Sequence, residues 1–323
     1  MRQISKSEQR RARRQVLLAD VAEMYFLKQM TQGKIAREIG TTPSNVSRMI
    51  SDCQRLGIVK ITINRSTIED KDLSNELMAR FKLKDARVVI ADDTETGQIS
   101  RSVASTGAEV LKENLIAGGT VGITWGRTLL SIIEAFGSPI ENGGIVVQLA
   151  GSVGATHEEF DSLSLVHRLA GLLGARPVHL SAPFIVEEPS VATSLMRNSS
   201  NAEARRIALN CDVVIVGVGN LDPQHSTLLN SGHVSREERD SIVNGDAVGE
   251  ICGHPIDIEG RLTAHAFSER VISIKPSEIL GAPTRIAVAA RPNVVRPLLG
   301  ALHGGYLTHL IVDTDTANGL LAE

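Results

Sequence analysis

The sequence predicts an α/β protein in which a small N-terminal helix-turn-helix domain with a wing precedes a larger domain built on a parallel sheet. The first observation is charge. Residues 1–65 carry thirteen Lys and Arg against five Asp and Glu, a balance of +8, which leaves −11 for the rest of a chain whose net charge is −3. The second is a series of short apolar runs that alternate with helical patterns beyond residue 84. We expect domains at residues 1–66 and 67–323.

Three helices are expected in the basic region. Apolar residues at spacings of three and four predict a helix over residues 13–29, with Leu17, Leu18, Val21 and Ala22 in its buried stripe. A second helix starts at Thr31 and ends at Gly40. The third has Thr42 as its N-cap, Pro43 at its first position and an inner face formed by Val46, Met49, Ile50 and Cys53. After Gly57, residues 58–63 predict a strand or wing.

The third helix has the composition of a helix that reads DNA. With Val46 and Ile50 inward, its first turns present small polar residues and one Arg outward. Arg48 can form a fork of hydrogen bonds to guanine, Asn45 can bind adenine, and the serines can contact phosphate or base edges. The alternative is that these are ordinary solvated residues. The candidate DNA-binding residues are Thr42, Ser44, Asn45, Ser47 and Arg48.

The larger domain is expected to follow a charged helical linker at residues 69–83. Runs such as Val213–Val216 are continuously apolar, which indicates strands covered on both faces. Ligands of such sheets bind in the loops after the strands. The expected strands span residues 87–91, 120–124, 144–150, 177–181, 212–219, 271–275, 284–290 and 309–313.

The loop after the second run is the candidate effector loop. It combines glycines, hydroxyls, an Arg and the start of a helix, which together can hold phosphate or sugar oxygens. Trp125 can stack on a sugar face or simply pack. A dinucleotide site is not expected, because Asp222 replaces the third glycine of that fingerprint. The candidates in this loop are Gly122, Thr124, Trp125, Gly126, Arg127 and Thr128.

The chain resembles the SorC family of sugar-binding bacterial transcriptional regulators. The resemblance rests on the segments 31–40, 45–48 and 56–61, on the tryptophan loop, and on ordered landmarks at residues 149–154, 181–183, 216–219, 245–250, 257–260 and 312–317. It implies an effector domain akin to sugar-phosphate isomerases and deaminases, assembly as a homodimer or homotetramer, and effector contacts from Thr124, Gly126, Arg127, Thr128 and Glu250. To the candidate effector contacts we add Asp257, which begins the landmark at residues 257–260.

Two positions depart from the family pattern. Val294 stands where many members have a Lys near the effector's phosphate. Either Arg291 or Arg296 supplies the missing cation, or the effector is an unphosphorylated sugar or polyol, which we favour. Glu250 replaces an Asp and so extends its carboxylate by one methylene. We include Arg291 among the candidate effector-binding residues.

The expected function is a repressor of a carbohydrate or polyol catabolic operon, controlled by a sugar, polyol or sugar-phosphate effector and bound to double-stranded operator DNA. The alternative is a sugar-phosphate isomerase or deaminase with an accessory DNA-binding domain. No catalytic constellation is evident, Cys252 and His254 are too sparse for a zinc site, and no cofactor is expected. No apolar run reaches the roughly 20 residues of a membrane span, and the three cysteines have no paired spacing, so a cytoplasmic protein is expected.

Overall fold

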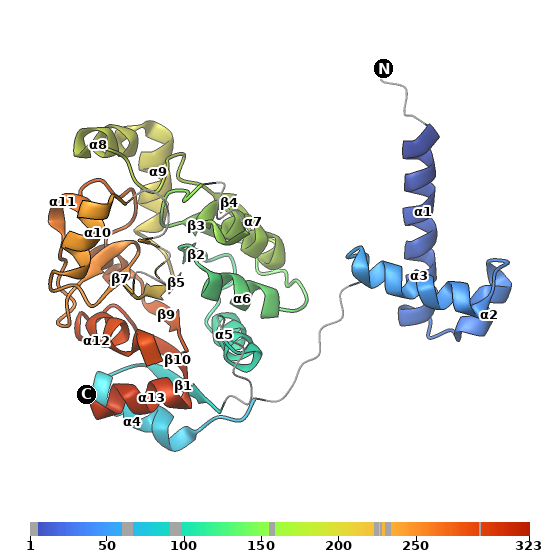
Figure 1. The fold of residues 1–323 in the computed structure, drawn as a ribbon, viewed down its shortest axis with the longest axis horizontal. Coiled ribbons are helices and arrows are strands. Elements are labelled where there is room, and N and C mark those ends of the chain that lie inside the picture. Colours follow the sequence, from blue (N-terminus) through green and yellow to red (C-terminus); the bar gives the residue numbers. More distant parts are fainter. Residues whose placement is uncertain are drawn as a thin grey trace. The chain divides into compact units, whose positions relative to one another are not determined.

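The computed structural model of the chain describes residues 6–59, 67–90, 99–154, 159–222, 226, 228–229, 234–290 and 292–323, with the backbone alone for residues 6–12 and 292. The chain divides into two compact units, Met1–Asn64 and Arg65–Glu323. In Figure 1 the first is a group of helices and the second is a sheet covered by helices. None of the described helices has the length and apolar character needed to cross a membrane.

The described part of the small unit contains three α-helices that pack together through buried apolar residues. They are α1 (Lys6–Ala22), which continues as the π-helical turn η1 (Glu23–Leu27), α2 (Gln32–Glu38) and α3 (Pro43–Arg55). The core contains Leu18, Val21, Ala22, Ile35, Ala36, Val46, Ile50 and Cys53. The prediction that Leu17 is buried is wrong, since 42% of it is exposed. The face of α1 that meets α2 and α3 runs through Leu18 and Val21, and one residue turns a helix by about 100°.

The helix boundaries in the small unit follow the predicted capping residues. The Thr31 hydroxyl accepts a hydrogen bond from Lys34 N at 3.4 Å, and the Thr42 hydroxyl accepts one from Asn45 N at 3.3 Å. Gly40 has a φ of 68°, a left-handed conformation in which glycine meets no steric penalty. Of the predicted wing, residues 60–63 lie outside the described residues, and Ile58 and Val59 lie in a bend against Cys53.

Seven strands of the described chain form one parallel sheet, as predicted, in the order β1-β10-β9-β5-β2-β3-β4. The strands are β1 (Asp85–Val89), β2 (Thr120–Ile123), β3 (Ile145–Gln148), β4 (Arg176–Val178), β5 (Val213–Val216), β9 (Thr284–Val288) and β10 (His309–Asp313). From β2 the sheet continues to β3 in one direction, whereas from β5 it continues to β9 in the opposite direction. The strand order therefore reverses between β2 and β5, and such a reversal opens a crevice at the carboxyl ends.

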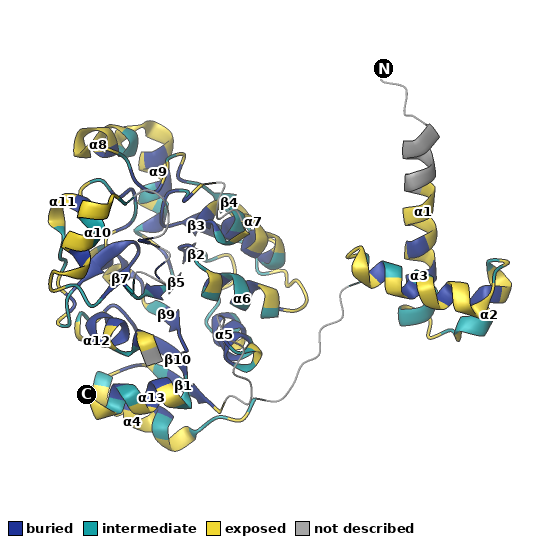
Figure 2. Cartoon of the chain, in the orientation of Figure 1, coloured by how far each residue is buried: buried dark blue, intermediate teal, exposed yellow. Residues whose placement is uncertain are grey.

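Helices cover both faces of this sheet (Figures 1 and 2). One face packs on α5 (Arg101–Glu113), α6 (Arg127–Ala135) and α7 (Ser162–Leu173). The other packs on α4 (Lys71–Phe81), α9 (Ser199–Ala208), α12 (Val295–His303) and α13 (Thr314–Ala322). The remaining helices are α8 (Pro189–Arg197), α10 (Arg236–Val243), α11 (His265–Ser268) and the 3₁₀ turns η3 (Pro276–Gly281) and η4 (Pro292–Val294).

The prediction that residues 69–83 form a linker is wrong, because α4 belongs to the core of the large unit. Leu77 is fully buried, and the Ser74 hydroxyl accepts a hydrogen bond from Val88 N of β1 at 3.0 Å. The predicted strand at residues 271–275 is also absent. This segment makes only isolated bridges, Val271 with Ile185 and Ser273 with Ala150.

A second, antiparallel sheet was not predicted. It consists of β6 (Val218–Gly219), β7 (Gly249–Ile251) and β8 (His254–Ile256). The helix α12 packs closely against it, since a Cβ at Gly249 would lie 2.5 Å from Pro297 Cβ and one at Gly300 would lie 2.5 Å from Asp257 O. Glycines at both positions thus permit the approach of helix and sheet.

Candidate DNA-reading helix and effector pocket

The first turns of α3 present the predicted polar residues to solvent. Ser44, Asn45, Ser47 and Arg48 are exposed, whereas Val46 between them is fully buried. Burial of Val46 and Ile50 fixes the rotation of the helix about its own axis. The exposed face therefore follows from the core, and it has the position of the base-contacting residues in a recognition helix.

Asn45 and Arg48 differ in how they are held. Asn45 Nδ2 donates a hydrogen bond to Thr41 Oγ1 at 2.8 Å, which orients the side-chain amide and leaves its oxygen and second N–H for a base edge. Arg48 has no hydrogen-bond or ion-pair partner among the described residues. Its guanidinium is therefore available for DNA, unlike those of Arg14 and Arg55, which both bind Asp52.

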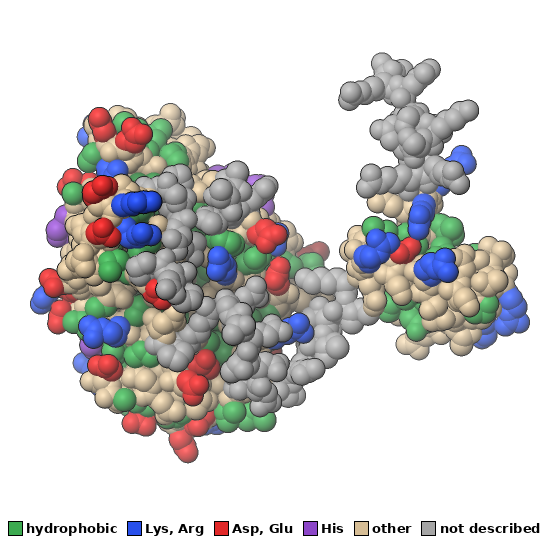
Figure 3. All heavy atoms as spheres, viewed as in Figure 1, with side chains coloured by type: hydrophobic (Ala, Val, Ile, Leu, Met, Phe, Trp, Pro, Cys, Tyr) green, Lys and Arg blue, Asp and Glu red, His purple; other side chains and the backbone are tan. Residues whose placement is uncertain are grey.

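The small unit also has the charge that DNA binding requires. Figure 3 shows Lys and Arg side chains on the visible face of its helices. Phosphate neutralisation by such residues supplies most of the non-specific affinity for DNA, whereas contacts to base edges supply specificity. Exposed Arg and amide side chains on one helix of a basic unit can do both.

A pocket of about 130 Å³ lies at the carboxyl ends of the parallel strands, where the strand order reverses. The loops after β2, β5 and β9 converge on it. The pocket brings together five of the predicted effector residues: Trp125, Gly126, Arg127, Thr128 and Glu250. It also contains Asn220, Asn293 and Val294, which were not predicted as effector contacts. Asn220 ends the glycine-rich segment after β5. That segment was the one sequence feature that could have identified Asn220 as an effector contact.

The loop after β2 is shaped by Gly126. Its φ of 134° is open to glycine but not to residues with a side chain, and its N–H donates to Phe160 O at 3.0 Å. Gly126 provides no side-chain cap for α6, so N–H groups of the first turn of this helix remain available for an oxygen-rich ligand. Arg127 lies over the Phe160 ring, 5.3 Å from its centroid.

Three residues of this segment have structural contacts of their own. Trp125 is 6% exposed and packs edge-to-face on Phe184 with 5.4 Å between ring centroids. The buried Thr124 hydroxyl accepts a hydrogen bond from Gly217 N at 3.4 Å, which joins the loops after β2 and β5. Gly122 lies inside β2, where a Cβ would be 2.8 Å from Leu149 Cδ2, and does not line the pocket.

Glu250 supplies the carboxyl group of the pocket. It is 8% exposed, and its Oε2 accepts a hydrogen bond from Gly253 N at 2.7 Å. Burial raises the pKa of this carboxyl to about 7, although the Gly253 N–H opposes the rise. Near neutral pH the group is therefore divided between a form that accepts hydrogen bonds only and a form that also donates one.

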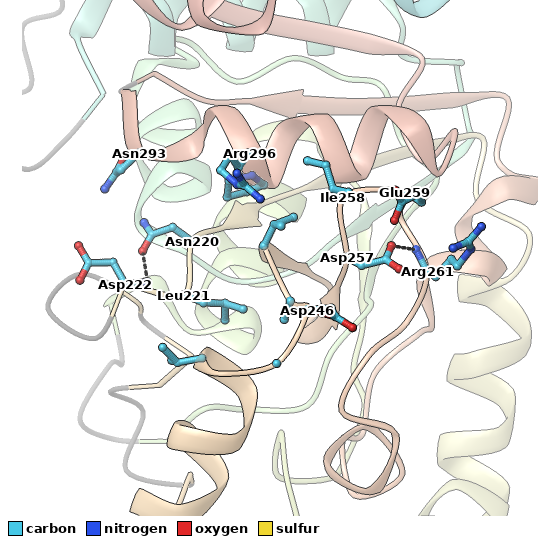
Figure 4. Close-up of a pocket in the computed structure, with 15 residues that line it drawn as sticks. Asn220, Leu221, Asp222, Asp246, Asp257, Ile258, Glu259, Arg261, Asn293 and Arg296 are labelled. Atoms are coloured by element: carbon cyan, nitrogen blue, oxygen red, sulfur yellow. Dashed lines mark hydrogen bonds between the residues drawn. The ribbon is translucent and has the colours of Figure 1, made fainter. Parts of the chain in front are cut away.

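The remaining predicted residues are not in this pocket. Asp257 lies in a neighbouring cleft, where its Oδ1 accepts a hydrogen bond from Arg261 N at 2.7 Å (Figure 4). Arg291 lies outside the described residues. Arg296 lies in the cleft of Asp257, and Val294 lines the smaller pocket. The apolar side chain of Val294 thus occupies the wall where the family resemblance anticipated a Lys.

Comparisons with known proteins give family matches in both units of the chain. The family described as "Putative sugar-binding domain" matches residues 65–322, and the "Crp-like helix-turn-helix domain" family matches residues 9–74. The sorbitol operon regulator of Klebsiella pneumoniae is 27% identical over 307 residues, which cover 94% of this chain and 97% of that protein. The erythritol catabolism regulatory protein EryD of Brucella abortus is 26% identical over 304 residues, covering 94% and 95%.

The solved structures include a match over nearly the full length. The crystal structure of the full-length sorbitol operon regulator SorC from Klebsiella pneumoniae superimposes with a TM-score of 0.71 at 28% identity, covering 95% of this chain and 99% of that chain. The fold, the exposed face of α3 and the strand-end pocket together lead to one assignment: the chain belongs to the SorC family of transcriptional regulators, which join a DNA-binding helix-turn-helix to a sugar-binding domain.

Proposed function

We propose that this regulator is a repressor of a polyol or carbohydrate catabolic operon and that a neutral sugar or polyol in the strand-end pocket releases it from its operator. The convergence of the loops after β2, β5 and β9 at the reversal of strand order carries this proposal. In this assignment residues 1–66 bind DNA and residues 67–323 bind the effector and a second copy of the chain. Such a protein acts at the chromosome, which places it in the cytoplasm.

The residues have distinct roles in this proposal. Arg48 and Asn45 read bases, Ser44 and Ser47 contact phosphates or base edges, and Thr42 caps the helix that carries them. In the pocket, Trp125 covers an apolar face of the effector. Arg127, Thr128 and Glu250 bind its hydroxyl groups. Arg291 is proposed as a further hydrogen-bond donor to the same ligand.

Two observations support an unphosphorylated effector. Val294 lines the pocket, so that wall offers no cation to a phosphate. The relatives named above regulate a sorbitol operon and erythritol catabolism, and both compounds are neutral polyols. A polyol satisfies the Glu250 carboxylate and the Arg127 guanidinium through its hydroxyls without placing a second negative charge beside Glu250.

The pocket does not favour the enzymatic alternative. Among the described residues that line it, Glu250 is the one carboxyl group, and no imidazole or thiol accompanies it. Burial raises the pKa of the nearby Cys252 thiol, which keeps it protonated and unreactive. General acid–base chemistry on a sugar phosphate normally uses a second titrating group. We therefore propose a sensor without catalytic activity.

The test combines DNA binding with a ligand screen. The full-length protein is titrated onto the DNA upstream of its own operon, with and without polyols, sugars and their phosphates. Effector binding that favours one arrangement of subunits is expected to weaken operator binding by about 5- to 150-fold, the usual range of allosteric coupling. The melting temperature of the protein is measured with the same compounds. If no compound changes either this melting temperature or the affinity of the protein for DNA, the proposal is wrong. Turnover of a sugar phosphate by the protein would favour the enzyme instead.

A further inference from the structure

A second cavity adjoins the effector pocket. This cleft has a volume of about 740 Å³ and lies between the start of α12, the loop that carries Asp246 and the loop that carries Asp257 (Figure 4). Asn220 and Asn293 line both the cleft and the effector pocket. The two cavities are therefore neighbours that share two amide side chains.

The two cavities differ in size. At about 130 Å³ the effector pocket falls below the roughly 300–1,000 Å³ of sites that bury a small-molecule ligand, whereas the cleft lies within that range. Building on the proposed function, we infer that the effector is a neutral polyhydroxylated compound that extends from the effector pocket into the cleft. Asn220 and Asn293 hold its middle, and Arg296 and Asp246 bind its far end.

The cleft is a product of close packing. Gly249 and Gly300 let α12 approach β7 and the segment after β8, and Arg296 of this helix lines the same cleft as Asp257. Figure 4 shows Asn293 and Arg296 at the start of α12, with Asp246 and Asp257 on the loops beside it. The lining side chains therefore come from segments that are separate in the sequence but fixed to one another in the fold.

The cleft contains hydrogen-bonding groups that the protein leaves unused. Within the described part of the chain, Arg296, Asn293 and Asp246 have no hydrogen-bond or ion-pair partner. Together they offer guanidinium and amide donors and carboxylate and amide acceptors. A hydroxyl group both donates and accepts, so a chain of hydroxyls can satisfy all of them.

The charge of the cleft favours a neutral ligand over a phosphorylated one. The described lining residues include four carboxylates, Asp222, Asp246, Asp257 and Glu259, against two guanidiniums, Arg261 and Arg296. This excess of negative charge repels a phosphate group, whereas it is compatible with neutral hydroxyls.

The test compares ligands of increasing length on the full-length protein by calorimetry. Erythritol, sorbitol, sorbitol phosphate and the glucosyl-sorbitol maltitol are titrated onto the wild type, onto Arg296→Ala and onto Arg236→Ala. Arg236 is an exposed Arg on α10 that does not line the cleft, which makes it the matched control. Affinity is expected to rise with ligand length in the wild type. Arg296→Ala is expected to weaken the longer ligands by about tenfold or more and to leave erythritol unchanged.

The possible outcomes separate this inference from the proposed function. Equal affinity for short and long ligands, or an Arg296→Ala variant that binds all of them as the wild type does, overturns the extended site and leaves a polyol sensor in place. An Arg296-dependent preference for sorbitol phosphate over sorbitol overturns the neutral ligand class. If none of these compounds binds, the extended site is overturned, and the proposed function is decided by the wider screen of polyols, sugars and their phosphates.

Discussion

Gly219 of β6 makes room for the carboxylate of Glu250 on the neighbouring strand β7. The two residues are paired in the antiparallel sheet, and a Cβ at position 219 would lie only 2.1 Å from Glu250 Oε1. The longer side chain at position 250 is thus accommodated by the absence of a side chain at position 219. This relationship fixes where the carboxyl group of the pocket can lie.

We expect Gly219→Ala to displace the Glu250 carboxylate and to lower effector affinity by at least tenfold. Overpacking of this kind also destabilises a protein by about 1–3 kcal/mol. Calorimetric titration and urea unfolding measure the two effects. Gly171→Ala is the control, because Gly171 is exposed on α7 with no atom within 4 Å of an added Cβ. That change is expected to stabilise the helix by about 0.5–1 kcal/mol. Unchanged effector affinity in Gly219→Ala would contradict the role of Glu250.

The contribution of Glu250 to the stability of the large unit is expected to decrease as the pH rises from about 4.5 to 7. Burial raises the pKa of Glu250 from 4.5 to about 7, so in this window the folded protein holds a proton that the unfolded chain has released. The Glu250 contribution to the free energy of unfolding then falls with pH, by on the order of 3 kcal/mol in total, and becomes constant above pH 7. The buried His254, whose pKa is lowered from 6.5 to about 4, changes the stability in the opposite direction, so the Glu250 contribution is measured as a difference from a variant. Urea unfolding of wild type and Glu250→Gln across this range measures the difference. Parallel curves for the two proteins would show that Glu250 does not titrate in this way.

Replacement of Arg48 by Ala is expected to abolish specific operator binding and to leave the effector-induced rise in melting temperature intact. A bidentate contact with guanine contributes about 1–3 kcal/mol of discrimination. Gel-shift titrations against operator and scrambled DNA measure the loss. Arg55→Ala is the control on the same helix, because Arg55 already binds Asp52 and is expected to have a smaller effect. A simultaneous loss of the effector response would mean that Arg48 has a structural role.

The Thr41→Val substitution is expected to relax specificity at a single base pair. It removes the hydroxyl that accepts a hydrogen bond from Asn45 Nδ2, so the amide is free to rotate. The loss should be about 0.5–1.5 kcal/mol of discrimination at one operator position, with little change in binding to non-specific DNA. Binding to a set of operators with single base changes identifies the position. A uniform loss across all of these DNAs would point to damage of the helix and not to the orientation of Asn45.

The local features of this protein could be determined from its sequence. Thr31 and Thr42 cap their helices through bonds to N–H groups three residues away, so the signal and its effect lie within one turn. Val46 and Ile50 set the exposed face of α3 through the helical period. The unbroken apolar run at residues 213–216 predicted a strand buried on both faces. Such features depend on neighbours in the chain, and the sequence displays them directly.

Only the tertiary structure decided which separate segments meet. The strands β7 and β8 have three residues each, too few for a pattern of alternation. They are held because β7 pairs with β6, β8 pairs with β7, and α12 packs against both. The placement of Glu250 beside Gly219, and of Asp257 in the cleft and not in the effector pocket, depends on this packing. Leu17 is exposed because α2 and α3 cover the neighbouring face of α1. Burial and cavity shape arise from contacts between residues that are distant in the chain, and no periodicity within one segment contains them.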